Sequence, residues 1–268
     1  MRKRKLTART ADRHLLYQES VQDPEGDALY LTRYYRKLTG RKLRLLREDF
    51  CGTAILSAAF VRLHERNKAI GVDLHAPTLA WGRRQNLSKL TREQRGRLTL
   101  LRKNVLAVRR PQAQLVAALN FSYCVFKTRP GLLAYFKNAR RSLQRGGVFI
   151  IDLYGGPEAE AEQQERTRLR GFTYVWDQET FDPVSFHTVC KIHFEFRDGT
   201  RMRDAFVYDW RLWTIPELRE LFGEAGFRNV HVLWESTHLK TGRGNGIYRR
   251  ISRGHADSAY IAYIVGQA

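Results

Sequence analysis

Residues able to bind a ligand cluster after the hydrophobic stretches of this 268-residue chain, where strands would end. The first stretch runs into "LREDFCGTA" (46–54), which offers Glu48, Phe50 and Gly52 before a helical pattern begins. A second stretch, "AIGVDL", ends near Asp73, about 20 residues further on, the distance at which an acid usually meets ribose hydroxyls. These spacings predict a site for a nucleoside-containing ligand.

The composition of the first loop decides which nucleoside fits it. A dinucleotide loop needs GxGxxG so that backbone amides can approach a pyrophosphate. In place of such a glycine pattern the loop offers Phe50, Gly52 and Ala54. Glu48 and Asp49 would repel a pyrophosphate at the mouth of the loop and attract a cation with an amino group. The loop therefore favours an adenosyl sulfonium over NAD, unless the two acids form structural salt bridges with Arg44 or Arg47.

The loops after the later stretches add polar and aromatic candidates. They are Asn104 and Val105, then Asn120, Phe121 and Tyr123, then Asp152 and Tyr154. In open α/β sheets, ligands bind beyond the carboxyl ends of the strands, so these loops are expected to surround one site.

Alternating strand and helix patterns between about 43 and 154 predict a parallel sheet with helices on both faces. Three aromatic and β-branched stretches then predict an antiparallel β insert at about 172–213, with a hairpin turn at Asp198-Gly199. Thr214 and Glu217 form a capping box for a following helix. We expect residues 1–42 to form an N-terminal helical lid and 43–268 to form one domain that contains the insert.

The net charge of +20, with a pI near 10.3, attracts polyanions. Two blocks, 28–47 and 239–255, contain no acid. They form either a solvated arginine-rich surface or an RNA-binding face, and the sequence leaves both open.

Other sequence features restrict the class of protein. The three cysteines offer no disulfide framework, which favours a reducing compartment, most simply the cytoplasm. His187 and His193 flank Cys190, but Cys190 would point to the opposite face of a strand, so we expect no metal site. No apolar run is long enough for a spanning helix, so no membrane partner is expected.

The ordered motifs "LREDFCGTA", "GVDL", "KNVLAV", "NFSYC" and "LQRGGVFIIDLYGG" resemble those of class I S-adenosylmethionine-dependent methyltransferases over about residues 43–154. "CGT" resembles the core of their first motif, and "AGF…HVLWE…AYIAYIV" resembles their closing helix and last two strands. The insert after the fifth strand is similar to that of the small-molecule branch, which includes glycine and sugar-amine N-methyltransferases. Phe50 and Ala54 depart from the usual motif glycines, which bears on how the methionine part fits.

The resemblance implies a seven-stranded, mostly parallel Rossmann-like sheet whose last strand is antiparallel. It implies S-adenosylmethionine as cofactor and S-adenosylhomocysteine as product. It also implies that Asp73 binds the ribose, that Asn104 and Val105 hold the adenine, and that Glu48 and Gly52 line the methionine part. The remaining candidates for the cofactor site are Phe50, Leu74, Asn120 and Phe121, with Tyr17 and Gln18 as a closing lid.

Methyl transfer from a sulfonium is a direct displacement, so alignment and exclusion of water matter more than a general base. Candidates for catalysis are Tyr123, Tyr154 and His187, and candidates for the substrate pocket are Tyr123, Tyr154, Trp176 and Tyr208. Each aromatic residue has core packing as an alternative role. The expected acceptor is a small molecule, methylated on N or O. RNA methylation through the two basic blocks and a binding module without catalysis remain alternatives, and the chain could be a monomer or a homodimer.

Overall fold

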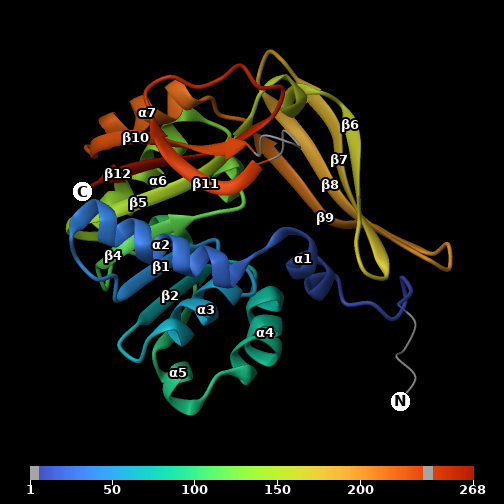
Figure 1. Ribbon diagram of the computed structural model, residues 1–268, viewed down its shortest axis with the longest axis horizontal. Coiled ribbons are helices and arrows are strands. Elements are labelled where there is room, and N and C mark those ends of the chain that lie inside the picture. The colour runs from blue at the N-terminus through green and yellow to red at the C-terminus, as the bar shows by residue number, and fades with distance from the viewer. Residues whose placement is uncertain (1–5, 238–243) are drawn as a thin grey trace. The chain divides into compact units, whose positions relative to one another are not determined.

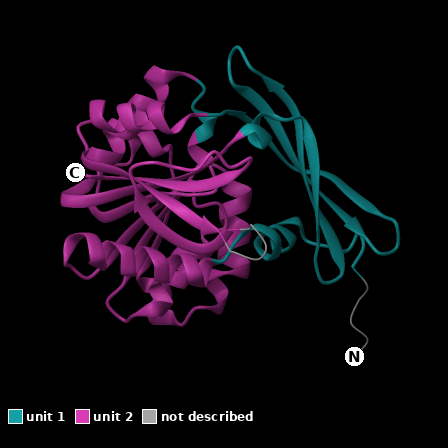
Figure 2. Ribbon diagram, turned by 45° about the horizontal axis from the view of Figure 1, so that its top comes forward, with its two compact units in different colours: residues 1–23, 124–127, 157–212 teal, residues 24–123, 128–156, 213–268 magenta. Residues whose placement is uncertain are grey.

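The computed structural model describes residues 6–237 and 244–268 of the chain (Figure 1). These residues form two compact units, each assembled from separate segments (Figure 2). Unit 1 contains residues 1–23, 124–127 and 157–212, and unit 2 contains residues 24–123, 128–156 and 213–268. Within the described ranges, every helix is too short or too polar to cross a lipid bilayer.

Unit 2 is built around a sheet that has eight strands in the described part of the chain, called here the large sheet. Its spatial order is β11 (Gly244–Ile251), β10 (Arg228–Thr237), β12 (Tyr260–Gln267), β5 (Leu143–Gly155), β4 (Ala113–Ala118), β1 (Leu45–Asp49), β2 (Lys68–Asp73), β3 (Leu98–Arg102). Strands β1 to β5 run parallel, whereas β12 is antiparallel to β5 and β10 is antiparallel to both β12 and β11. The predicted mostly parallel sheet with an antiparallel end is confirmed.

The sequence prediction of seven strands missed β11. This strand lies at the edge of the large sheet, and most of its side chains are exposed. An edge strand can be polar and charged because it needs no buried face, so it carries little of the alternation by which strands are recognised.

Helices flank the large sheet on both faces, as predicted (Figure 1). They are α2 (Pro24–Thr39), α3 (Ile55–Leu63), α4 (Ala76–Gln85), α5 (Arg92–Gly96), α6 (Arg129–Arg141) and α7 (Ile215–Glu224), with short 3₁₀ turns η1 (Leu87–Lys89), η2 (Val105–Ala107) and η3 (Ser122–Val125). Neighbouring residues of β5 show the two faces. Phe149 packs on Phe136 of α6 and Phe222 of α7, while Ile150 belongs to the core under α2 and α3. The predicted capping box of α7, Thr214 with Glu217, is present.

Unit 1 contains the antiparallel insert, a second sheet whose described strands number four and which is called here the small sheet. Its order is β6 (Gln163–Arg168), β7 (Phe172–Asp182), β8 (His187–Phe196) and β9 (Arg201–Arg211), and α1 (Arg13–Val21) and η4 (Pro157–Glu160) complete the unit. Buried and partly buried residues alternate along β8, and Leu16 of α1 packs in the core on one face. The Asp198-Gly199 turn lies between β8 and β9 as predicted. The sequence-based prediction did not include β6, because its residues, "QQERTR", include no hydrophobic one.

Candidate functional site

The loop after β1 makes a tight left-handed turn. Phe50, Gly52 and Ala54 have φ values of 56°, 52° and 55°, so two of the three positions hold side chains in a conformation that favours glycine. Gly82 of α4 packs against this loop, because a Cβ there would lie 2.4 Å from the carbonyl oxygen of Thr53. The missing motif glycines are therefore offset by close packing of α4, and the turn keeps its shape without them.

Asp73, at the end of β2, connects the first two loops. Its Oδ2 accepts a hydrogen bond from the Gly52 N–H at 2.8 Å, and its Oδ1 accepts one from the His75 N–H at 2.7 Å. The predicted ribose-binding carboxylate thus lies directly beside the predicted glycine of the first motif. Leu74 follows it with 61% of its surface exposed.

The two acids of the first loop have different roles. Asp49 is buried and forms an ion pair with Arg47, whose Nε lies 2.7 Å from Oδ1, and Tyr135 donates a hydrogen bond to Oδ2 at 2.9 Å. The salt-bridge alternative that the sequence left open therefore holds for Asp49, with Arg47 rather than Arg44 as the partner.

Glu48 is also buried, and its Oε2 accepts hydrogen bonds from the backbone N–H and the hydroxyl of Ser57. Burial raises the pKa of Glu48 to about 8, against the opposing effect of the Ser57 hydrogen bonds. At neutral pH the loop consequently presents less negative charge than the sequence predicts.

The loop after β3 begins with Asn104, whose side-chain oxygen accepts a hydrogen bond from the Leu106 N–H at 2.9 Å and caps η2. Val105 is buried, and its carbonyl accepts a hydrogen bond from the Asn138 amide at 2.7 Å. The exposed Asn104 is therefore held on a fixed backbone, as a residue that recognises a base must be.

The loop after β4 is held by the buried carboxylate of Asp152, a loop candidate to which the sequence assigned no anchoring role. Asn120 and Phe121 have φ values of 57° and 56°, and their N–H groups donate hydrogen bonds to the two oxygens of Asp152 at 2.7 and 2.9 Å. Burial raises the pKa of Asp152 to about 7, and these two hydrogen bonds oppose that rise. The ring of Phe121 lies 4.7 Å from the ring of Tyr154, measured between centroids.

Tyr123 follows in the same loop but is only 1% exposed, with its ring 6.5 Å from that of Phe136. Its burial favours the core-packing alternative over contact with a substrate.

The candidates in unit 1 form an aromatic group and a separate charged group. The Tyr208 ring lies 6.0 Å from Trp176 and 4.4 Å from Trp210, and its hydroxyl is hydrogen-bonded to Tyr17 of α1. Gln18 follows Tyr17 on the same helix. His187 instead pairs with the exposed Asp209 and with Lys127, whose Nζ lies 3.2 Å from Nε2.

The metal candidates do not converge. Along β8 the partly buried His187 and His193 alternate with the buried Cys190, so the thiol lies on the other face of the strand. Across the described ranges, no group of three or more His, Cys, Asp or Glu is arranged to hold a metal ion.

Solved structures that match nearly the whole chain share this architecture, and the fold is that of class I S-adenosylmethionine-dependent methyltransferases. The chain is similar to CalS10, an amino pentose methyltransferase from Micromonospora echinaspora solved with S-adenosylmethionine bound, at 16% identity and a TM-score of 0.66, covering 95% of each chain. It is also similar to DesVI of Streptomyces venezuelae at 20% identity and a TM-score of 0.66, covering 94% of this chain and 95% of that one.

A third match is the sugar N-methyltransferase KedS8 from Streptoalloteichus sp ATCC 53650, at 18% identity and a TM-score of 0.63, covering 100% of this chain and 95% of that one. No protein-family model matches the sequence, and no curated protein matches it by sequence. The resemblance to class I methyltransferases predicted from the motifs is confirmed at the level of the fold.

Proposed function

We propose that this protein is an S-adenosylmethionine-dependent methyltransferase that acts on a small-molecule acceptor. The observation that carries the proposal is the hydrogen bond between the Gly52 N–H and Asp73, which joins the loops after β1 and β2 at the carboxyl end of the large sheet. In a sheet of this fold, that is where a nucleoside ligand binds.

The residues of these loops fit the groups of the cofactor. A carboxylate suits two ribose hydroxyls, which Asp73 would bind, and the exposed Leu74 and capped Asn104 would contact the adenine beside Val105. Gly52, Phe50 and Glu48 would line the methionine part, with Asn120 and Phe121 on the neighbouring loop. When bound, S-adenosylmethionine supplies a methyl group on a positively charged sulfur. The protein's own task is to orient the acceptor and exclude water.

The acceptor would bind on the aromatic face of the small sheet. That face carries the half-buried Trp176 and Tyr208, backed by the buried Trp210 and Cys190, and so it suits a neutral ring better than a carboxylate or phosphate. The neighbouring structures include an amino pentose methyltransferase and a sugar N-methyltransferase, which favours an amine on a small ring as the acceptor.

Catalysis would need at most one base, to keep the acceptor nitrogen unprotonated. The candidates for that role are His187 with its partner Asp209, and Tyr154 beside Phe121.

The test is transfer of labelled methyl groups from S-adenosylmethionine to a library of ring amines, followed by Trp176→Ala on the best acceptor. We expect the variant to raise the acceptor KM about 2- to 10-fold, from the loss of aromatic contact, while cofactor affinity stays unchanged. Val184→Ala is the matched control, because Val184 is also in unit 1 but is 93% exposed. Transfer to carboxylate or phosphate acceptors alone would contradict the assignment of this face.

A further inference from the structure

The positive charge of this protein is concentrated in one of its two units. Unit 2 contains 32 Lys and Arg against 13 Asp and Glu, a net charge of +19. Unit 1 contains 15 against 14 and is almost neutral at +1. Several acids of unit 2 are buried, including Glu48, Asp49 and Asp152, so its surface carries even less negative charge than its composition indicates.

The densest exposed charge lies in neither of the two blocks that stand out in the sequence. Block 28–47 forms α2 and β1, which supply core residues such as Leu31 and Tyr35, and its Arg47 is buried in the ion pair with Asp49. Of block 239–255, residues 239–243 lie outside the described residues, and the rest forms β11 and the segment after it.

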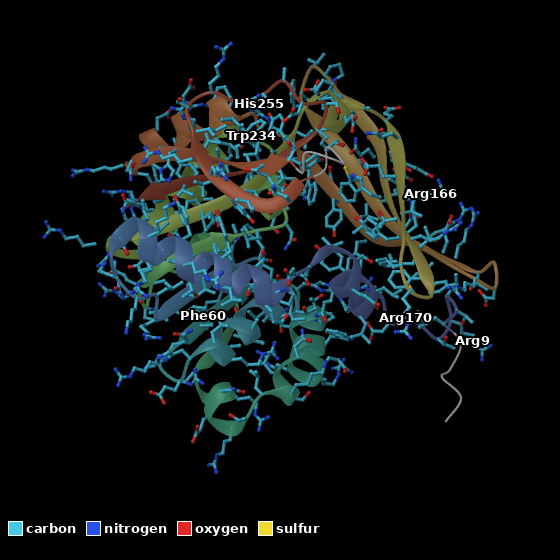
Figure 3. All side chains as sticks on the ribbon, viewed as in Figure 1. Arg9, Phe60, Arg166, Arg170, Trp234 and His255 are labelled. Atoms are coloured by element: carbon cyan, nitrogen blue, oxygen red, sulfur yellow. The ribbon has the colours of Figure 1, made fainter. Side chains whose placement is uncertain are left out.

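The segment 83–103, which we call the basic edge, is a different surface. It includes the end of α4, then η1, α5 and β3, the outermost strand of the large sheet on that side, and α4 and α5 both contact β3. Its exposed cations are Arg83, Arg84, Lys89, Arg92, Arg95, Arg102 and Lys103, and its acid is Glu93. Figure 3 shows side chains with nitrogen tips projecting outward around α4 and α5.

Most of these cations are not used to hold the fold. Arg95 donates a hydrogen bond to the Leu90 carbonyl at 2.7 Å, and the partly buried Arg97 donates to three carbonyls. In the described part of the chain, no hydrogen bond or ion pair is formed by the side chains of Arg83, Arg84, Lys89, Arg92, Arg102 and Lys103. Their charges are available to a ligand.

We propose that the basic edge binds the phosphate backbone of a nucleic acid. Five of its seven exposed cations are arginines, whose planar guanidinium matches phosphate oxygens in pairs. Large apolar side chains are exposed at Leu74 and Val125 but at no position between them, so this surface lacks the groups with which a protein inserts into a membrane. The charge pattern thus fits a polyphosphate better than a lipid surface, and the binding does not depend on methyl transfer.

The experiment measures binding of short single-stranded RNA and DNA to the full chain, without cofactor, as a function of salt. The test variant replaces Arg83, Arg84, Lys89 and Arg92 by glutamine. Each phosphate contact contributes about 0.7 to the slope of log K against log salt for single strands, so loss of four contacts should reduce the slope by about 3. The wild type should lose about 100-fold in affinity between about 50 and about 200 mM salt, and the variant only a few-fold.

The matched control replaces four exposed arginines of unit 1 by glutamine and removes the same charge. These are Arg168, Arg170 (labelled in Figure 3), Arg197 and Arg203. We expect the control to keep the wild-type slope to within about 1. Equal loss in both variants would mean that total charge rather than this surface is responsible, and it would overturn the proposal. Wild-type slope in the test variant, or binding to vesicles of anionic lipid without binding to oligonucleotides, would also overturn it.

Discussion

Replacing Asp152 by asparagine tests how the loop after β4 is held. Both oxygens of Asp152 accept N–H groups from consecutive residues, Asn120 and Phe121, each in the left-handed region at a cost of about 1–2 kcal/mol. Asparagine has the same shape but keeps one acceptor oxygen. One buried N–H would then face an amide nitrogen, a loss of about 1–3 kcal/mol in the free energy of unfolding.

The size of this loss should depend on pH, because burial raises the pKa of Asp152 from 3.8 to about 7. A raised pKa means that the folded state binds the proton more tightly. The carboxyl group therefore contributes stability that is fully present below about pH 4 and is lost as the pH rises through about 7. Between about pH 5 and about pH 8 the wild type should lose about 3 kcal/mol from this group, at about 1.4 kcal/mol per unit over roughly two units. The asparagine variant does not titrate there.

The assay is urea unfolding of the wild type and Asp152→Asn at both pH values, with Glu65→Gln, an exposed carboxylate, as the control. The variant should be about 1–3 kcal/mol less stable at the lower pH and equal to or more stable than the wild type at the higher one. Its affinity for S-adenosylmethionine should fall at both, because Asn120 and Phe121 lose their anchor. A stability difference that is the same at both pH values would refute the assigned titration, and unchanged cofactor affinity would refute the role of the loop.

Three further predictions concern the first loop. Burial raises the pKa of Glu48 to about 8, so the contribution of this group to stability is lost as the pH rises through 8. Glu48→Gln should therefore be more thermally stable than the wild type above that pH. Superimposable melting profiles of the two proteins would count against this. Asp49→Asn leaves Arg47 buried without its partner charge and should cost about 3–5 kcal/mol in urea unfolding, and a cost below about 1 kcal/mol would show that the pair is not desolvated. Gly82→Ala places a Cβ against the first loop and should lower both the stability, by about 1–3 kcal/mol, and the cofactor affinity. Gly223→Ala, in open space, is the control and should raise the stability by about 0.5–1 kcal/mol. A Gly82→Ala variant that unfolds at higher urea than Gly223→Ala and binds cofactor as well in calorimetry would contradict the packing.

The architecture was predictable from the sequence because its central strands are buried and its turns are specific. The Asp198-Gly199 hairpin and the Thr214 capping box are formed by residues only a few positions apart, so the sequence alone predicts them. Strands β6 and β11 were not predictable in the same way, because β6 has no hydrophobic residue and β11 buries Tyr248 and Ile251 only in part.

The site was predictable as a set of loops but not in its internal pairing. Arg47 lies two residues before Asp49 on one strand, so both side chains lie on the same face of the sheet. This spacing could have identified Arg47, rather than Arg44, as the ion-pair partner of Asp49. The anchoring role of Asp152 had no such signal, since its partners Asn120 and Phe121 are more than 30 residues away and meet it only in the folded sheet.

Calorimetric titration of the protein with S-adenosylmethionine, S-adenosylhomocysteine and NAD tests most directly whether the carboxyl end of the large sheet binds an adenosyl sulfonium. We expect the first two to bind and NAD not to bind. Asp73→Ala should weaken cofactor binding by about 1.5–3 kcal/mol, about 10- to 150-fold, through loss of charged hydrogen bonds. Binding of NAD with no affinity for S-adenosylmethionine, or unchanged affinity in Asp73→Ala, would contradict the proposed site.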